Sequence, residues 1–384
     1  MAVYESDEGI CIDGFKAAGV RRGRYGLALI ACDRVCRTAG VFTRNNIKAA
    51  PLQLNKRKLD AGFQAVVANS GNANACVSEG LDDAEMMCAK AAEELNISKK
   101  NVGVASTGII GKRLDMDLIN ELIGEAAGQL TSSAEGSTKA AQAIMTTDKT
   151  VKMLSIEYKG IKVGAIAKGA GMIAPDMATM LCFISTNADL RVSELQDALT
   201  ESVDESFNML SIDEDMSTND MVLLLSTATA ECNISDFKHA LNYLTREMAI
   251  KMAKDGEGST KYLQVEVKGA LTKKQARKGA KAIISSNLVK TALHGENPNW
   301  GRITAALGSK IGYLFAQTDI IFSSGAQKAL VLEKGVVGDL ETARKVLAER
   351  EIKLTVNLNQ GEYKATAYGC DLSPEYVEIN AKYS

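Results

Sequence analysis

Hydrophobic residues recur at helical spacing in three segments of the chain. In each segment the apolar positions fall three or four residues apart, which places them on one face of an α-helix. The last of these segments opens near Ser235-Asp236, residue types that cap helix N-termini. The pattern therefore predicts amphipathic helices over residues 115–130, 192–207 and 237–248.

Other segments have the patterns of strands. Continuous apolar runs over 161–167, 179–184 and 221–227 predict buried strands. Near the C-terminus, apolar and polar residues alternate over 354–358, and the turn residues that follow lead into a second alternating run over 363–368. Two alternating runs joined by Asn-Gln-Gly predict a β-hairpin.

The irregular order of these elements decides the expected fold class. Helices and strands do not alternate regularly, and a hairpin is expected, so a purely parallel sheet is excluded. We expect the class α/β (α+β), with mixed sheets sandwiched by helices and a second lobe built from the C-terminal part of the chain. The chain has no short-period repeat, and its composition marks no domain boundary.

Composition and charge narrow the possible partners. Charged residues make up 24% of the 384 residues and apolar residues 46%, an ordinary balance for a globular protein. A formal net charge of -2 gives no electrostatic reason to expect nucleic acid or an anionic membrane as partner. The residues after Met1 are acidic and lack the apolar core of a signal peptide. No apolar run approaches the roughly 20 residues that span a bilayer. These features predict a cytoplasmic protein.

The cysteines and histidines of the sequence limit which metal sites and catalytic mechanisms are possible. The eight cysteines are scattered, with no C-x-x-C pair, so the sequence predicts no metal site. Only two histidines occur, His239 and His294, and any Ser-His or Cys-His mechanism has to use one of them. His239 falls on the polar side of its predicted helix, and neither histidine lies in a recognisable catalytic motif.

A loop before one predicted strand has the features of a self-cleavage site. A strand runs into a loop containing Gly169, Gly171 and Pro175, and the chain re-enters an apolar run at Thr179. If the Thr179 hydroxyl attacks the carbonyl of Ala178, an N-to-O acyl shift gives an ester that water can hydrolyse. The new α-amino group, with a reference pKa of about 8, can then serve as the base for the hydroxyl on the same residue. Such a mechanism needs no histidine.

Long sequence strings resemble one known family. The string Lys168-Gly-Ala-Gly-Met-Ile-Ala-Pro-Asp-Met-Ala-Thr179-Met-Leu closely resembles the cleavage-site signature of the ornithine acetyltransferases. Seven further strings resemble the same family in the same order, so the resemblance runs through almost the whole chain. They lie at 14–20, 43–51, 68–76, 106–111, 217–220, 255–261 and 297–302.

The resemblance implies a cleaved enzyme. Self-cleavage between Ala178 and Thr179 would give an α chain of residues 1–178 and a β chain of residues 179–384, and both chains would contribute to one catalytic body. It also implies an αββα-like body of the N-terminal-nucleophile type, a C-terminal lobe over roughly residues 270–384, and an α2β2 heterotetramer.

The resemblance also implies a reaction. Acetyl would move from N2-acetylornithine to Thr179, and glutamate would then take it to give N-acetylglutamate, a ping-pong transfer in arginine biosynthesis. Transfer through an acetyl-threonine ester needs no cofactor. Whether acetyl-CoA serves as a second donor is left open, because no residue is known to decide it.

Site residues follow from the motifs that match. The resemblance assigns the oxyanion hole to Thr107 and Gly108, and a backbone N–H beside a hydroxyl suits the charge that develops on the carbonyl oxygen. The substrate contacts that the resemblance implies are one of Thr146 and Thr147, together with Lys168, Thr179, Glu257, Asn380 and Ser384. Lys168 suits a substrate carboxylate and Glu257 a substrate ammonium group.

Two departures from the family pattern affect this assignment. The tail Asn380-Ala-Lys-Tyr-Ser384 stops one residue earlier than the family's, so Ser384 reaches the substrate only if the tail shifts. Glu214 stands where glycine is expected, and a side chain there is expected to alter a turn.

Two functions other than acetyl transfer are compatible with parts of the sequence. If water rather than glutamate resolved the acyl-threonine ester, the protein would be an N-terminal-threonine hydrolase, an amidase or aminopeptidase. Glutamate-dependent turnover distinguishes the two. The string 256–261 superficially suggests a phosphate-binding P-loop, but its lysine follows the hydroxyl residues instead of preceding one. A P-loop nucleotide-binding protein is therefore a poor hypothesis.

Overall fold

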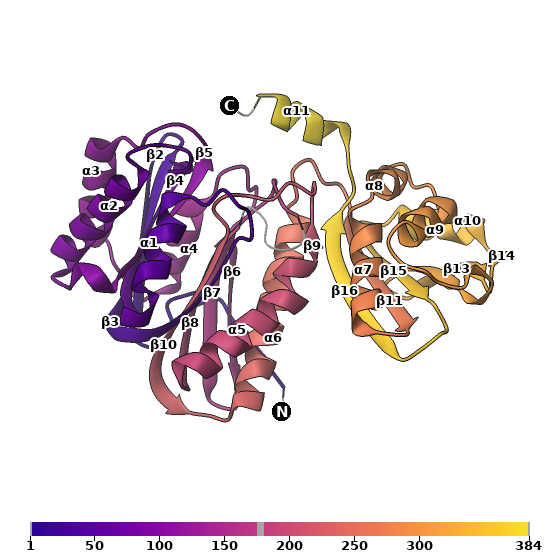
Figure 1. Ribbon diagram of the computed structural model, residues 1–384, viewed down its shortest axis with the longest axis horizontal. Coiled ribbons are helices and arrows are strands. Elements are labelled where there is room, and N and C mark those ends of the chain that lie inside the picture. Colours follow the sequence, from indigo (N-terminus) through magenta and orange to yellow (C-terminus); the bar gives the residue numbers. More distant parts are fainter. Residues whose placement is uncertain (1, 175–179, 383–384) are drawn as a thin grey trace. The chain divides into compact units, whose positions relative to one another are not determined.

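The computed structural model describes residues 2–174 and 180–382, and it divides into two compact units (Figure 1). The first unit contains the described residues of Met1–Gly169, Asp176–Glu205 and Met216–Met248. The second contains the described residues of Ala170–Pro175, Ser206–Asp215 and Ala249–Ser384. The chain thus enters the second unit twice, in short segments, before its C-terminal part completes that unit.

A mixed sheet forms the frame of the first unit. Its strand order is β1-β6-β7-β8-β10-β3-β4-β5, with β2 paired to β3. The pairs β4–β5 and β8–β10 are parallel and the others antiparallel. The strands are β1 (Tyr4–Ser6), β2 (Phe15–Arg22), β3 (Tyr25–Phe42), β4 (Phe63–Asn72), β5 (Val102–Ile109), β6 (Lys152–Tyr158), β7 (Ile161–Lys168), β8 (Leu181–Asp189) and β10 (Met221–Glu231).

Helices cover this sheet. One hydrophobic cluster joins the first three helices to β2–β5, and a second joins α4 to both halves of the sheet. On β8, Phe183 belongs to the second cluster while its neighbour Ile184, on the opposite face, is also fully buried. The helices are α1 (Ala50–Lys58), α2 (Gly80–Leu95), α3 (Met116–Ala127), α4 (Ala134–Ile144), α5 (Val192–Glu205) and α6 (Ile234–Lys254), whose last residues belong to the second unit, with short 3-10 turns at Leu59–Ala61 and Lys99–Asn101. A further 3-10 turn, Phe207–Met209, belongs to the second unit.

The second unit has a mixed sheet of its own, in the order β14-β13-β12-β15-β11-β16-β9. Helix α7 packs on β11 and β16, and α10 packs on β12 and β13. The strands are β9 (Leu210–Ser211), β11 (Tyr262–Ala270), β12 (Asp319–Ser324), β13 (Gln327–Glu333), β14 (Val336–Val337), β15 (Glu351–Asn357) and β16 (Tyr363–Cys370). The helices are α7 (Lys273–Ile284), α8 (Asn287–His294), α9 (Trp300–Gly308), α10 (Leu340–Leu347) and α11 (Pro374–Lys382), with a 3-10 turn at Phe315–Gln317.

Most of the predicted elements are confirmed. The helix predicted over 115–130 is α3, that over 192–207 is α5, and that over 237–248 lies within the longer α6. The apolar runs at 161–167 and 221–227 are β7 and β10, and the described part of the run at 179–184 begins β8. The predicted fold class, mixed sheets sandwiched by helices with a second unit formed mainly by the C-terminal part, is also confirmed.

The predicted C-terminal hairpin is wrong. Both strands exist, as β15 and β16, but they do not pair with each other. Strand β11 lies between them, parallel to β15 and antiparallel to β16. The connection wraps around the end of β11, where Gln360 and Gly361 donate their N–H groups to the carbonyl oxygen of Gly269. Alternation shows that a segment is a strand but does not identify its partner, and here an earlier strand takes the central place.

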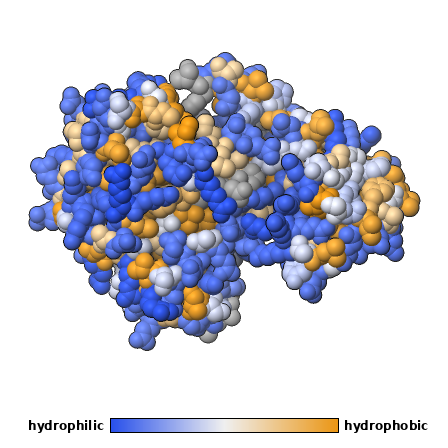
Figure 2. Space-filling view, in the orientation of Figure 1, coloured by the Kyte–Doolittle hydropathy of each residue, from blue (hydrophilic) through white to orange (hydrophobic). Residues whose placement is uncertain are grey.

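The surface of the described residues carries both hydrophilic and hydrophobic side chains. Figure 2 shows hydrophilic residues over most of the visible face, with hydrophobic residues interspersed among them, as is normal for a folded protein. Within residues 2–174 and 180–382, no helix has the length and apolar character to cross a membrane.

Candidate active site

The predicted site residues fall in both units. Thr107, Gly108, Thr146, Thr147 and Lys168 belong to the first unit, and Glu257 and Asn380 to the second. Ala178, Thr179 and Ser384 lie outside the described residues.

Thr107 and Gly108 lie at the end of β5, beside the end of β4. Gly108 is paired with Gly71 in the parallel register and has φ of 131°. A Cβ atom at Gly108 would lie 2.4 Å from the carbonyl carbon of Gly71 and 2.5 Å from the backbone nitrogen of Asn72. Only glycine fits there, because both the backbone conformation and the space exclude a side chain. Thr107 is buried, 2% exposed.

A buried amide fixes this end of the sheet. The side-chain nitrogen of Asn219 donates to the carbonyl oxygens of Ala73, at 2.6 Å, and Ser106, at 2.8 Å. Asn219 thereby joins the segment after β4 to the residue before Thr107. Fully satisfied buried polar networks of this kind restrict the backbone to one geometry. The pair Thr107-Gly108 is therefore presented on a rigid support, as an oxyanion-binding group requires.

Lys168, the last residue of β7, lies in a buried charged cluster. The Asp148 carboxylate accepts hydrogen bonds from Lys152 Nζ at 2.6 Å and from the N–H of Gly169 at 2.7 Å. Lys168 is 2% exposed. Burial alone would raise the pKa of Asp148, but the charges of Lys168 and Lys152 and the hydrogen bonds outweigh it and lower this pKa to about 2. Asp148 therefore holds its negative charge beside Lys168 at neutral pH.

Thr146 and Thr147 lie next to this cluster. Both are half-buried, and the N–H of Thr146 donates to Asp148 at 3.1 Å. That contact uses the backbone, so it does not decide which of the two hydroxyls would meet a substrate.

Replacing Asp148 by asparagine is expected to destabilise the first unit strongly. The substitution removes the negative charge that faces two buried ammonium groups, and breaking a buried ion pair costs about 3–5 kcal/mol. The measurement is the free energy of unfolding from denaturant titration at pH 7. The matched control is Glu121→Gln, which breaks an exposed pair with Arg22 (side chains 63% and 48% exposed) and should cost less than about 1 kcal/mol. Equal losses in the two variants would refute the structural role of Asp148.

A second buried carboxylate, that of Asp220, contacts the residue that follows the predicted nucleophile in the sequence. Asp220 Oδ1 accepts the N–H of Met180 at 3.1 Å, and the N–H of Met221 donates to the carbonyl oxygen of Met180. Asp220 Oδ2 accepts no hydrogen bond of normal geometry from the described residues. Burial raises the pKa of Asp220 to about 7, although the N–H of Met180 and the hydroxyls of Thr43 and Ser217 act to lower it. Asp220 can therefore be neutral or charged near neutral pH.

The titration of Asp220 is expected to make stability depend on pH. Between pH 4 and pH 7 the folded state keeps a proton that the unfolded state, with a pKa of about 4, has lost. Stability from this group is therefore present below pH 4 and declines as pH rises to about 7, by a few kcal/mol in all. The measurement is the unfolding free energy of the native chain and of Asp220→Asn across this range. The difference between them should shift in favour of the variant as pH rises, and a constant difference would contradict the raised pKa.

In the second unit, Glu257 is held against the segment that leads to the predicted cleavage site. Its N–H donates to the carbonyl oxygen of Ala170 at 2.8 Å, and its carboxylate accepts from the side-chain nitrogen of Asn380 at 2.7 Å. A Cβ atom added to Gly171 would lie 2.3 Å from the carboxyl carbon of Glu257. Two predicted substrate residues, Glu257 and Asn380, are thus in direct contact.

A carboxylate that sequence reasoning missed fixes the same segment. Asp213 accepts the N–H groups of Met172 at 2.6 Å and Ile173 at 2.7 Å, and it also accepts the Tyr376 hydroxyl at 3.1 Å. Burial raises the pKa of Asp213, against the effect of these hydrogen bonds. Asp213 therefore positions the backbone that runs towards Ala178 in the sequence.

Glu214, the departure from the family pattern, adopts a left-handed conformation with φ of 68°. Glycine is favoured there because it has no Cβ to strain. The turn expected of glycine is thus kept despite the side chain. It brings the N–H of Asp215 back to the Asp213 carboxylate at 3.2 Å.

The described part of the chain contains no group of three or more His, Cys, Asp or Glu side chains arranged to hold a metal ion. The charged groups described above are instead paired with each other, with backbone N–H groups or with amide side chains. Such arrangements hold polar substrates and loops in place.

Comparison with known proteins identifies the family of the chain. The model of the ArgJ family matches residues 14–384. The glutamate N-acetyltransferase of Methanothermobacter thermautotrophicus is 46% identical, over 98% of this chain and 97% of the relative. The arginine biosynthesis bifunctional protein ArgJ of Symbiobacterium thermophilum is 45% identical, over 96% of each chain. A crystal structure of the ArgJ protein from Bacillus halodurans is 36% identical, with a TM-score of 0.49, and covers 52% of this chain and 98% of that one. Since the family model and both relatives span nearly the whole sequence, this chain belongs to the ArgJ family.

Proposed function

We propose that the protein is a glutamate N-acetyltransferase of arginine biosynthesis, which moves acetyl from N2-acetylornithine to glutamate. The observation that carries the proposal is the 46% identity, over nearly the full length of both chains, with a relative named for this activity. Within the second unit, the largely buried Glu257 carboxylate and its Asn380 partner suit a small, charged substrate.

The first proposed step is self-cleavage. The Thr179 hydroxyl attacks the carbonyl carbon of Ala178, the C–N bond breaks, and the hydroxyl proton passes to the nitrogen, which becomes the new α-amino group. Water then hydrolyses the ester. The products are residues 1–178, ending in a carboxylate, and residues 179–384, beginning with Thr179.

Acetyl transfer then proceeds in two halves. The α-amino group takes the Thr179 hydroxyl proton as the oxygen attacks the acetyl carbonyl of N2-acetylornithine. The C–N bond breaks, the proton passes to the leaving nitrogen, and ornithine departs. Glutamate's α-amino group next attacks the acetyl ester, its proton returns to Thr179, and N-acetylglutamate leaves. In both halves the N–H of Gly108 and the hydroxyl of Thr107 stabilise the negative oxygen.

The proposed substrate contacts pair each charged side chain with a substrate group of opposite charge. Lys168 would bind the substrate carboxylate and Glu257 an ammonium group, since charge-assisted hydrogen bonds are the stronger ones in a buried site. Both residues are largely buried, at 2% and 7% exposure. Asn380, one of Thr146 and Thr147, and Ser384 would complete the site.

The remaining features of the proposal follow from the same family resemblance. The cleaved chains would assemble as an α2β2 heterotetramer in the cytoplasm. The transfer needs no cofactor, because the acetyl group is carried on Thr179, and acetyl-CoA would act only as a second donor.

Product analysis tests the function. Purified protein is incubated with N2-acetylornithine with and without glutamate, and ornithine, N-acetylglutamate and acetate are quantified. Glutamate-dependent N-acetylglutamate, equal in amount to the ornithine released, is expected. Acetate and ornithine produced equally with and without glutamate would show a hydrolase instead. No turnover by cleaved protein would exclude both activities.

Gly171→Ala is expected to slow self-cleavage. The added methyl group would overlap the Glu257 carboxylate, so either this carboxylate, with its bond to Asn380, or the segment before the cleavage site has to move. Overpacking costs about 1–3 kcal/mol, which, paid in the cleavage step, lowers the cleavage rate by about 5- to 160-fold. The measurement is the fraction of cleaved chain against time after synthesis. The control is Gly312→Ala, whose added methyl group would meet nothing within 4 Å. If both variants cleave at the native rate, the close contact with Glu257 has no part in maturation.

A further inference from the structure

A polar cavity in the second unit lies apart from every residue assigned above. Its volume is about 240 Å³, and it opens where the parallel strands β11 and β15 begin. The residues that matter for its chemistry are three basic ones, one acid and two hydroxyl residues. They are Lys254, Lys261, Arg350, Glu351, Ser259 and Thr260.

The lining of this cavity carries an excess of positive charge. Three cations and one carboxylate, that of Glu351, line the cavity, and a second carboxylate, that of Glu296, pairs with Lys261 from outside the lining. Arg350 is exposed, and its guanidinium makes no hydrogen bond or ion pair with the described residues. A planar guanidinium offers several N–H donors in a fixed fork, which matches the oxygens of a phosphate or carboxylate.

One wall of the cavity is rigidly built. The backbone N–H groups of Thr260 and Lys261 both donate to Asp371 Oδ1, at 2.8 and 2.9 Å. The other oxygen of Asp371 meets the Thr260 hydroxyl at 2.6 Å and His294 Nδ1 at 2.8 Å. Asp371 is fully buried, so this network fixes the backbone of the wall before any ligand arrives.

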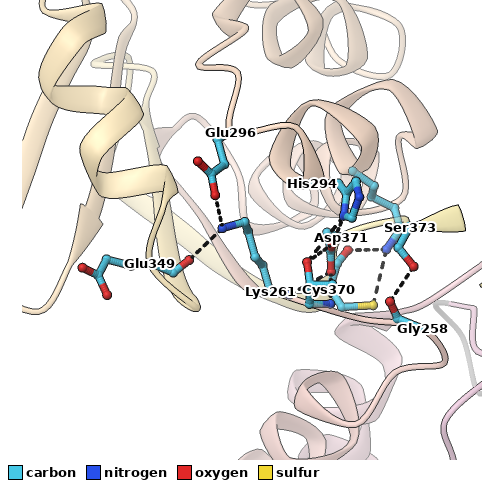
Figure 3. Close-up of polar contacts among 10 residues, drawn as sticks. Gly258, Lys261, His294, Glu296, Glu349, Cys370, Asp371 and Ser373 are labelled. Atoms are coloured by element: carbon cyan, nitrogen blue, oxygen red, sulfur yellow. Dashed lines mark hydrogen bonds and ion pairs between the residues drawn. The ribbon is translucent and has the colours of Figure 1, made fainter. Parts of the chain in front are cut away.

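Lys261 extends from that wall. Figure 3 shows its side chain directed away from Asp371, towards Glu296 and Glu349. The ammonium group is 3.1 Å from Glu296 Oε1 and 3.3 Å from the carbonyl oxygen of Glu349. The Lys261 side chain is only 8% exposed, so its position is set by packing as well as by these contacts. A charge held in place in advance costs less ordering entropy when it binds a ligand.

The carboxylates that pair with the two lysines are accessible to solvent. Lys254 lies 2.6 Å from Glu351, with side chains 41% and 62% exposed, and the Glu296 partner of Lys261 is 48% exposed. The exposed Lys254–Glu351 pair contributes little to stability, because solvent screens it. An anionic ligand can therefore compete with Glu351 for Lys254 and add contacts to the Arg350 guanidinium.

We propose that this cavity binds the phosphate group of a small anionic ligand, with Arg350, Lys254 and Lys261 as its cationic partners. A carboxylate has only two oxygens, so it cannot accept hydrogen bonds from Arg350, Lys254 and Lys261 through a separate oxygen each. A phosphate group has up to two charges and enough oxygens for all three. The site is not a P-loop, because its donors are side chains from three separate segments and not a glycine-rich turn before a helix.

Calorimetric titration with inorganic phosphate tests the proposal. It is done at constant ionic strength in chloride buffer, with acetate as the carboxylate comparison. Saturable binding of phosphate, tighter than that of acetate, is expected. Arg350→Gln should raise the dissociation constant about tenfold or more, since one charge-assisted hydrogen bond contributes about 1.5–3 kcal/mol. Lys254→Gln should weaken binding in the same direction.

A matched control separates the cavity from general charge effects. Arg344→Gln removes the same charge from an exposed position on α10, outside the cavity, and should leave phosphate binding unchanged. Absence of saturable phosphate binding, equal affinity for acetate, or equal loss in the Arg344 and Arg350 variants would overturn the proposal. A third titration, with coenzyme A, identifies the source of the group. Binding tighter than that of phosphate and sensitive to Arg350→Gln indicates a nucleotide-like ligand, and weaker binding indicates free phosphate.

Discussion

Thr179→Ala is expected to leave the protein as one uncut chain and to abolish acetyl transfer. The substitution removes the only hydroxyl that the proposed mechanism uses as nucleophile. Without cleavage, the α-amino base never forms either. Loss of a nucleophile that acts together with its base lowers turnover on the order of 10⁴-fold or more. Intact-mass spectrometry is the measurement, and the native protein should give two fragments that join at Ala178 and Thr179.

Two further variants make this result decisive. Thr179→Ser keeps a hydroxyl and should still cleave and turn over, at a reduced rate. Thr186→Ala removes a buried hydroxyl from β8, where it donates to the carbonyl oxygen of Lys162, and should cleave normally. A native chain that remains uncut would remove the base from the mechanism. Normal cleavage of Thr179→Ala would show that another residue is the nucleophile.

Local sequence patterns predicted those helices well that bury one face and expose the other. Periodicity located α3, α5 and most of α6, because each buries a stripe of side chains that recurs every three or four residues. Pairing was not predicted in the same way. The partner of β16 is β11, far earlier in the chain, and the alternation within 354–368 contains no information about it. The pairing of strands depends on packing between segments that are far apart in the sequence, and a short stretch of sequence contains no information about it.

The site was predicted unevenly for a similar reason. Lys168 and Glu257 were assigned to the site from their motifs; the structure buries both, and their substrate contacts stay a prediction. The carboxylates Asp148, Asp213 and Asp220 were not singled out, because a charged residue in a loop usually faces water. One signal could have found Asp220: it stands immediately before the apolar run that begins at Met221, where an unpaired charge is costly.

Thr107→Val is expected to lower the rate of acetyl transfer about 100- to 1,000-fold. Valine keeps the size and the β-branch of threonine, so β5 and its contacts should remain intact. The hydroxyl is lost, and with it one donor to the negative oxygen of the proposed transition state. The steady-state rate constants kcat and KM for N2-acetylornithine are the measurement, with kcat expected to fall much more than KM rises.

Ser106→Ala is the matched control for Thr107→Val. Ser106 is the neighbouring residue on β5, its hydroxyl is buried, and that hydroxyl has no hydrogen-bond partner among the described residues. Its removal takes a hydroxyl of the same kind from the same strand without removing a contact, so kcat should change less than about threefold. If Thr107→Val behaves like Ser106→Ala, the Thr107 hydroxyl does not stabilise the transition state, and Gly108 has to act with a different donor. If only Thr107→Val loses rate while both variants unfold at the same denaturant concentration, the loss is chemical and not structural.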